Sequence, residues 1–300
     1  MQGYLHPRYA HSFSEFGEPT FLPRAKGWLI RRAIPGTSLF DAMGPYPLFF
    51  CENWEHLSED LLAFSETLVS ISFVVDPFGF QNGAAYFHNF DVFNPFKDHY
   101  ILDTTQPFSK SISKNKQKNA KHALKQLEVH LEIAPRIDLN SWVRLYDHLI
   151  ERHQIKGLRA FSRASFEDQI SIPNTHCFWV TFEGEVVGGN LFYIQDDVAY
   201  AHLSAFSPKG YDLGAPYAVK WIAIQHLAEI VRYINFGGAP SQEQNSKDGL
   251  SLFKQGWSTE IRKSYFCGKI LNPLIYQTLS LNHPTKSTWF PAYRAGEYGT

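Results

Sequence analysis

Three strand-like segments separated by short turns constrain the fold of this chain more than any other feature. Residues 176–182 are rich in aromatic and β-branched side chains, and the turn residues Glu183-Gly184-Glu185 follow them. Residues 186–194 form the second segment, and residues 198–206 form the third after another polar turn. Turns this short join neighbouring antiparallel strands. The pattern therefore predicts a three-stranded antiparallel meander.

Helical periodicities surround this meander. Apolar residues recur at spacings of three and four over residues 57–68, 141–152 and 214–231. Further β-rich runs cover residues 27–34, 69–75, 99–102, 129–133, 233–236 and 260–270. This order favours an α/β (α+β) fold with a mixed, largely antiparallel sheet over a doubly wound parallel one.

The order of elements also repeats. Each half of the chain runs from helices through strands to a helix and a final strand, although the amino-acid sequence of one half is not repeated residue by residue in the other. We therefore expect an N-terminal half at 1–135, a C-terminal half at 136–270 and a tail at 271–300 that packs on the N-terminal half.

Composition excludes several classes of protein. The net charge of −1 argues against attraction of DNA to the whole surface. No apolar run approaches the ~20 residues that span a bilayer, and the first ten residues do not form a secretory signal. The cysteines, Cys51, Cys177 and Cys267, are too scattered for a metal site and are expected to be buried thiols. These features predict a cytoplasmic protein without a metal.

A basic segment stands out in the N-terminal half. Residues 107–127 have the pattern of a long helix, and no acidic residue occurs within them. Five lysines step by three or four residues, which places them on one face: Lys110, Lys114, Lys118, Lys121 and Lys125. Such a stripe is either a solvated helix face or a docking place for a ligand that carries phosphate. The ligand would be a nucleotide sugar, a lipid-linked pyrophosphate, coenzyme A (CoA) or tRNA.

Four stretches of the second half carry a family resemblance. They are F-E-G-E-V-V-G-G-N-L-F (182–192), A-Y-A-H-L-S-A-F-S-P-K-G-Y (199–211), I-N-F-G-G (234–238) and D-G-L-S-L-F-K-Q-G-W (248–257). Together they resemble the GNAT superfamily, and within it the FemAB-like acyltransferases, which contain two GNAT units. In the first half, Y-I-L-D (100–103), S-K-N (113–115) and K-H-A (121–123) are similar to a strand and basic helix of that branch.

The chain departs from the family pattern at two places. Gln117 stands where the family usually has an arginine. The loop S-P-K-G-Y-D-L-G-A-P (207–216) lacks the Q/R-x-x-G-x-G/A motif with which acetyl-CoA-dependent GNAT enzymes hold a pyrophosphate. Gly210, Gly214 and Ala215 could still let the backbone approach a phosphate, so they are the candidate cofactor-binding residues. FemAB-like proteins commonly lack this motif as well.

The resemblance also implies a catalytic site. It places Lys254 beside the transferred acyl group, where a fixed cation stabilises developing negative charge. Asp248 is a candidate base, and Tyr211 is a candidate donor to the leaving group. The candidate substrate-binding residues are Phe253, His202, Tyr217, Arg152 and Lys114. Several have structural alternatives: aspartates beside glycines often cap helices, and His202 is equally consistent with a hydrogen-bonded structural histidine.

The resemblance implies three alternative functions. The first is transfer of an acyl group, such as acetyl, from a CoA thioester to an amine of an amino sugar or cell-envelope precursor. The second is aminoacyl-tRNA-dependent transfer of the Fem type. The third is a non-catalytic binding protein with a GNAT fold. The compact size and the net charge favour the first, while the acceptor and the oligomeric state are not readable from the residues.

Overall fold

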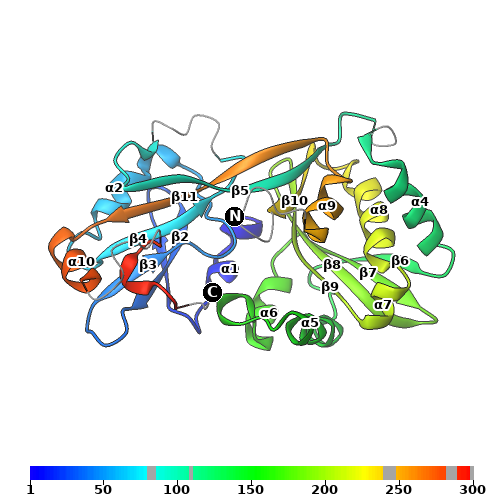
Figure 1. The fold of residues 1–300 in the computed structure, drawn as a ribbon, viewed down its shortest axis with the longest axis horizontal. Helices are drawn as coiled ribbons and strands as arrows, with labels where there is room; N and C mark the ends of the chain where they lie inside the picture. Colours follow the sequence, from blue (N-terminus) through cyan, green and yellow to red (C-terminus); the bar gives the residue numbers. More distant parts are fainter. Residues whose placement is uncertain (80–85, 108–110, 239–247, 282–288, 298–300) are drawn as a thin grey trace. The chain divides into compact units, whose positions relative to one another are not determined.

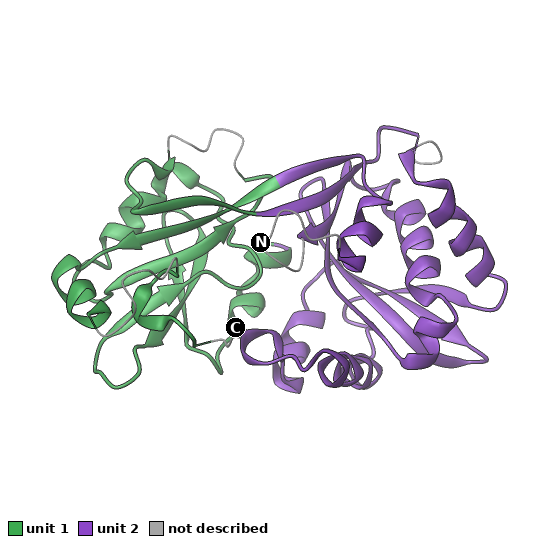
Figure 2. Cartoon of the chain, viewed as in Figure 1, with its two compact units in different colours: residues 1, 3–96, 263–300 green, residues 2, 97–262 purple. Residues whose placement is uncertain are grey.

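The computed structural model forms two compact units (Figure 2). It describes residues 1–79, 86–107, 111–238, 248–281 and 289–297. Unit 1 contains residues 1, 3–96 and 263–300, and unit 2 contains residues 2 and 97–262. Two strands, β5 (Val92–Asp103) and β11 (Glu260–Ile270), contribute residues to both units.

The predicted meander forms the middle of the sheet in unit 2 (Figure 1). It consists of β7 (Thr175–Phe182), β8 (Glu185–Gln195) and β9 (Val198–Phe206), each antiparallel to the next. Glu183 and Gly184, between β7 and β8, both have positive φ, as a two-residue hairpin turn of type I′ requires. The prediction of this meander is confirmed.

Three further strands complete the sheet of unit 2. β6 (Glu128–Ile133) pairs with β7 on one side. On the other side, β10 (Tyr233–Gly238) runs parallel to β9 and antiparallel to β5. A mixed, mostly antiparallel sheet flanked by helices confirms the predicted fold class.

Helices cover both faces of this sheet. Phe178 of β7 packs in one core, against a cluster that includes Val219 of α8 (Ala215–Leu227). The next residue, Trp179, points to the opposite face and meets Trp142 of α5 (Leu139–His153), with 6.1 Å between ring centroids. α4 (Lys114–Ala123) lies beside α8, and α6 (Arg163–Ile170) lies beside α5. We refer to these two sides as the α8 face and the α5 face.

The basic helix is shorter than predicted. Ser113 caps its N-terminus by accepting a hydrogen bond from the Lys116 amide, so the described helix begins at Lys114. It ends at Ala123, where the chain turns toward β6. Lys110 lies outside the described residues. The helix at 57–68 is also shorter and is α2 (Leu57–Leu62).

Unit 1 has its own core, and its strands belong to the same hydrogen-bonded sheet as those of unit 2. The strands pair in the order β1 (Glu18–Leu22), β2 (Gly27–Ala33), β3 (Phe40–Met43), β4 (Ser70–Val75) and β11. Short helices, α1 (Pro7–His11), α2 and α10 (Pro273–Ser280), accompany them. The core is rich in aromatic rings, as in the packing of Phe49 on Phe73 with centroids 4.5 Å apart.

The C-terminal part of unit 1 is held by buried polar contacts. Arg294, which is 4% exposed, donates to both carboxylate oxygens of Asp41 on β3 and to the Ala33 carbonyl. The Tyr293 hydroxyl lies 2.7 Å from the hydroxyl oxygen of Ser70 on β4. The division of the chain into halves at residues 135 and 136 remains a prediction, since compactness and duplication are different properties.

Candidate active site

The segment that carries Lys254 is a short helix. α9 (Gly249–Gln255) begins at Asp248, whose carboxylate accepts hydrogen bonds from the Ser251 amide at 2.8 Å and the Ser251 hydroxyl at 2.6 Å. Asp248 is therefore a helix cap in this structure. The cap fixes the start of α9, and Lys254 follows in its last turn.

Lys254 reaches from α9 to the end of β10. Its Nζ donates a hydrogen bond to the Gly238 carbonyl oxygen at 2.7 Å. A β-carbon on Gly237 would stand 3.4 Å from Nζ, and Gly237 has a φ of +82°. Glycine therefore suits this position twice, because its backbone is in the left-handed region and the amine passes close by. This explains the first of the two glycines in the I-N-F-G-G segment, Gly237.

Polar groups on β10 and β5 hold this strand end in place. The Asn235 side-chain oxygen accepts from the Gly237 amide at 2.8 Å and lies 3.2 Å from Nδ1 of His99. Burial lowers the pKa of His99 to about 4, with a smaller opposing effect of the Asn235 hydrogen bond. His99 is therefore neutral at pH 7 and acts as a hydrogen-bonding group.

A second lysine lies close to this strand end, and sequence reasoning missed it. Lys220, on α8, is only 7% exposed. Its Nζ donates to the side-chain oxygen of Asn190 on β8 at 3.1 Å. The amine also lies 4.8 Å from the ring centroid of Phe236 and 5.4 Å from that of Phe192. A lone cation inside the apolar run A-P-Y-A-V-K-W-I-A-I was the signal that could have revealed it.

Burial weakens the proton affinity of both lysines. Burial, with a smaller contribution from the charge of the nearby Lys254, lowers the pKa of Lys220 to about 7. Burial is also the main cause that lowers the pKa of Lys254 to about 8; Lys97 on β5 contributes to this decrease and Asp248 opposes it. Perturbed amines of this kind are typical of functional sites, where charge develops during a reaction.

Aromatic side chains line the neighbouring surface of α9. Phe253 meets Tyr217 of α8 edge to face, with ring centroids 5.2 Å apart. The amine of Lys116 lies 4.6 Å from the Phe253 centroid and 5.3 Å from that of Tyr217. Lys116 thus contacts Phe253 and Tyr217, whereas the predicted Lys114 lies on the exposed side of α4.

Two of the predicted residues form a separate pair. The guanidinium carbon of Arg152, on α5, lies 4.2 Å from the ring centroid of Tyr211. Tyr211 belongs to α7 (Pro208–Asp212) and also packs on Phe206. Burial raises the pKa of Tyr211, with an opposing effect of Arg152. Tyr211 therefore keeps its proton at pH 7, where it can donate a hydrogen bond or a proton.

His202 lies away from this group. It stacks on Tyr193 with centroids 4.5 Å apart, and its Nε2 is 3.1 Å from the Gln169 side-chain oxygen on α6. These partners place it on the α5 face of the sheet, opposite Lys220. Burial lowers its pKa to about 3, so the ring is neutral at pH 7.

Several backbone amides of the loop between β9 and α8 already donate hydrogen bonds to groups of this chain. The Gly210 amide donates to the Ser207 hydroxyl at 3.1 Å, and a β-carbon on Gly210 would lie 2.2 Å from the Val187 carbonyl oxygen. Gly214, with a φ of +76°, forms the N-cap of α8. Ala215 follows it, and Pro216 has no amide hydrogen to offer. Gly210 is thus explained by close packing on β8.

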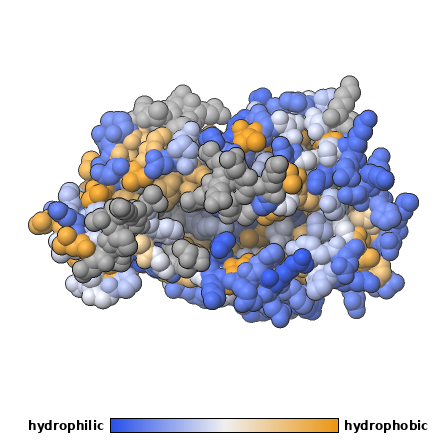
Figure 3. All heavy atoms as spheres, in the orientation of Figure 1, coloured by the Kyte–Doolittle hydropathy of each residue, from blue (hydrophilic) through white to orange (hydrophobic). Residues whose placement is uncertain are grey.

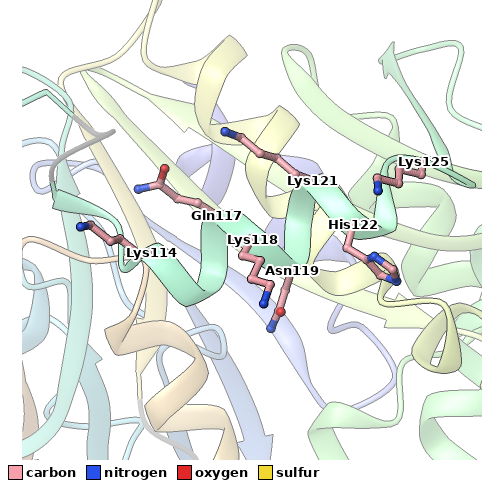
Figure 4. Close-up of a pocket in the computed structure, with 7 residues that line it drawn as sticks. All are labelled: Lys114, Gln117, Lys118, Asn119, Lys121, His122 and Lys125. Atoms are coloured by element: carbon pink, nitrogen blue, oxygen red, sulfur yellow. The ribbon is translucent and has the colours of Figure 1, made fainter.

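A basic hollow of about 480 Å³ lies along α4 (Figure 4). Its lining residues fan out from the helix and its C-terminal end: Lys114, Gln117, Lys118, Asn119, Lys121, His122 and Lys125. None of these lining residues is acidic, and Figure 3 shows a largely hydrophilic surface in this part of unit 2. Four lysines of the predicted stripe therefore border one hollow.

Two negative findings concern the described part of the chain. No helix there is long and apolar enough to cross a membrane. No group of histidine, cysteine, aspartate or glutamate side chains in those residues is arranged to hold a metal ion.

Comparison with known proteins identifies a domain. Residues 110–245 match the family model described as an acetyltransferase (GNAT) domain. The matched range contains Lys220 and ends before Lys254. A search of curated protein sequences finds no match.

Solved structures with similar folds extend over both units. A crystal structure of FemX superposes with a TM-score of 0.63 at 14% identity, covering 91% of this chain and 93% of that chain. L-PGS from Bacillus licheniformis superposes with a TM-score of 0.60 at 15% identity, covering 90% of this chain and 93% of that chain. A third similar structure is the C-terminal domain of a protein assigned as a lysylphosphatidylglycerol synthetase in Agrobacterium fabrum. It superposes with a TM-score of 0.60 at 13% identity, covering 86% of this chain and 84% of that chain. At such low identities the similarity concerns the fold.

Proposed function

We propose that this chain, an N-acyltransferase with a GNAT acetyltransferase domain and a FemAB-like fold, transfers an acyl or aminoacyl group to an amine beside Lys254. The observation that carries the proposal is the contact of Lys254 Nζ with the Gly238 carbonyl oxygen. This contact fixes a cation at the end of β10, next to a second buried amine. The domain match favours this enzyme over a non-catalytic binding protein.

The proposed reaction needs a stabilised oxyanion. The acceptor amine attacks the carbonyl carbon of an ester or thioester, and the carbonyl oxygen becomes negative in the tetrahedral intermediate. The Lys254 ammonium compensates this charge. Collapse then breaks the bond to the leaving oxygen or sulfur, and the proton released by the amine passes to the leaving group or to water. Tyr211 and Asp248 remain candidates for proton transfer, although Asp248 already accepts from Ser251.

The loop geometry favours an aminoacyl ester donor carried by tRNA. A pyrophosphate cradle needs free amides at a helix N-terminus. Here the Gly210 amide is bound to Ser207 and Pro216 lacks one. The α4 hollow, bordered by four lysines, offers phosphates a docking place instead. The match to an acetyltransferase domain keeps acyl-CoA as the second candidate donor.

The acceptor belongs to the same proposal. The similar structures include FemX and a protein assigned as a lysylphosphatidylglycerol synthetase. For this chain, they suggest an amine on a cell-envelope precursor or a lipid headgroup as the acceptor. An amino sugar is the corresponding acceptor for an acyl-CoA donor.

A donor screen tests the function directly. The purified chain is incubated with radiolabelled acetyl-CoA or with a mixture of labelled aminoacyl-tRNAs, together with a pool of amine acceptors. Label that becomes resistant to mild alkali has moved from an ester or thioester to an amide. We expect amide formation with aminoacyl-tRNA that is lost in Lys254→Met and kept in Lys26→Met, a surface control paired with Glu52. Transfer at an equal rate by Lys254→Met would refute the site.

A further inference from the structure

Lys220 is a buried cation that the proposed reaction does not require. Its Nζ has three hydrogens, and Asn190 accepts one of them. The rings of Phe192 and Phe236 occupy two other sides of the amine. A cation taken out of water is costly unless a counter-charge and hydrogen-bond acceptors replace the water. The surroundings of Lys220 supply only part of this compensation.

Lys254 shares this situation. The ion pairs formed among the described residues include neither Lys220 nor Lys254. The positive charge of Lys254 acts on Lys220, and that of Lys97 acts on Lys254. Within the described residues, the charged or titratable groups that act on the pair or on its neighbour His99 are Lys97 and Asp98 on β5 and Asp248 at the start of α9. Because His99 is neutral at pH 7, the balance of these groups and the two protonated lysines together is positive.

We propose that Lys220 and Lys254 together form an anion-binding subsite that receives a carboxylate or phosphate group of a substrate. Lys220 is the more buried of the two and lies against Phe236 of β10, and Lys254 contacts Gly238 at the end of the same strand. The inference rests on the proposed function in attributing the anion to a substrate. It makes Lys220 a specificity-determining residue, because a neutral substrate would leave two repelling cations uncompensated.

Sulfate and acetate are suitable probes, since both keep their charge between pH 6 and pH 9. Each is titrated into the ligand-free protein at constant ionic strength with sodium chloride, and the thermal midpoint is recorded. We expect at least one probe to raise the midpoint with saturation, and Lys220→Met to weaken its binding at least tenfold. Lys26→Met should bind like the wild type. Saturation by sulfate alone identifies a phosphate group, and saturation by acetate alone identifies a carboxylate.

Two results would overturn the proposal: no saturable effect of either probe, or equal affinities of Lys220→Met and the wild type. If Lys220→Met does not fold, the pH dependence of the wild type decides. With a pKa of about 7 for Lys220 and about 8 for Lys254, both lysines are mostly protonated at pH 6 and mostly neutral at pH 9. Binding of the anion should therefore be at least tenfold tighter at pH 6 than at pH 9. Equal binding at both values would refute the subsite. Binding without any amide formation would keep the subsite and reject the acyltransfer.

Discussion

Replacing Lys220 by methionine should stabilise the protein at neutral and acidic pH. The lysine carries a proton in the unfolded chain up to pH 10.5, but in the folded chain only up to about pH 7. Unfolding therefore takes up a proton between these values, and the stability of the wild type rises with pH across this window. Methionine has a similar length, fills the space between Phe192 and Phe236, and does not titrate.

The size of the effect follows from the same values. A tenfold change in a protonation equilibrium is worth about 1.4 kcal/mol, so the charged Lys220 destabilises the fold by at most about 5 kcal/mol below pH 7. Relaxation of the surroundings reduces this figure, and loss of the hydrogen bond to Asn190 costs the variant about 1 kcal/mol. We expect Lys220→Met to be more stable than the wild type by about 2 kcal/mol at pH 6.

Urea denaturation at pH 6, 8 and 10 measures this difference, in buffers without sulfate or carboxylates. Comparison of the two proteins at each pH removes the titration of all other groups. The gap should be largest at pH 6 and nearly closed at pH 10. A variant that is less stable than the wild type at pH 6, or a gap that does not change with pH, would show that Lys220 is not a buried cation without a counter-charge.

Three other perturbations test separate parts of the structure. Lys254→Met should lower kcat/KM for transfer by about 10² to 10³ if its cation stabilises the oxyanion; an unchanged rate contradicts the role. Charge reversal of Lys118 and Lys121 to glutamate should weaken binding of charged tRNA at least tenfold and flatten its salt dependence, as filter binding at several salt concentrations would show; an unaltered slope rejects the hollow as the docking place. Asp41→Asn should lower the free energy of unfolding by about 3 kcal/mol, because the buried cations Arg294 and Arg32 lose the Asp41 carboxylate and keep only Glu297 as a counter-charge; a loss below 1 kcal/mol in urea would mean that the contact is weak.

The sequence was most informative where local chemistry decides the structure. The turn at Glu183 and Gly184 places two positive φ angles between two β-rich runs, and the predicted hairpin is present. The glycines after Phe236 belong to a segment that the sequence also singled out, and in the structure the amine of Lys254 lies at this strand end. The extent of the basic helix was harder to predict, because the lysine pattern continues beyond the residue where Ser113 caps the helix.

Parts of the site depend on tertiary packing that local patterns do not encode. His202 was equally consistent with substrate binding and with a structural role, and only the folded chain shows that its ring contacts Gln169 on a helix distant in sequence. Lys220 was hidden because a single lysine in an apolar helix looks like a residue that extends to the surface. Its burial follows from the position of Asn190 on β8. Lys116 of α4 contacts the Phe253 ring only because α4 and α9 lie next to each other in the folded chain.

The attachment of α4 to the segment around α9 has a geometric consequence. The Ser113 amide donates to the Gly256 carbonyl oxygen at 3.1 Å, and a β-carbon on Gly256 would lie 2.6 Å from the Lys116 side chain. The outer lysines of α4 are thus held at a set spacing from Lys254. A donor that uses both places must bridge that spacing between its phosphates and its acyl carbon. Under the proposed docking on α4, we expect this spacing to select donors by length, independently of the group that they transfer.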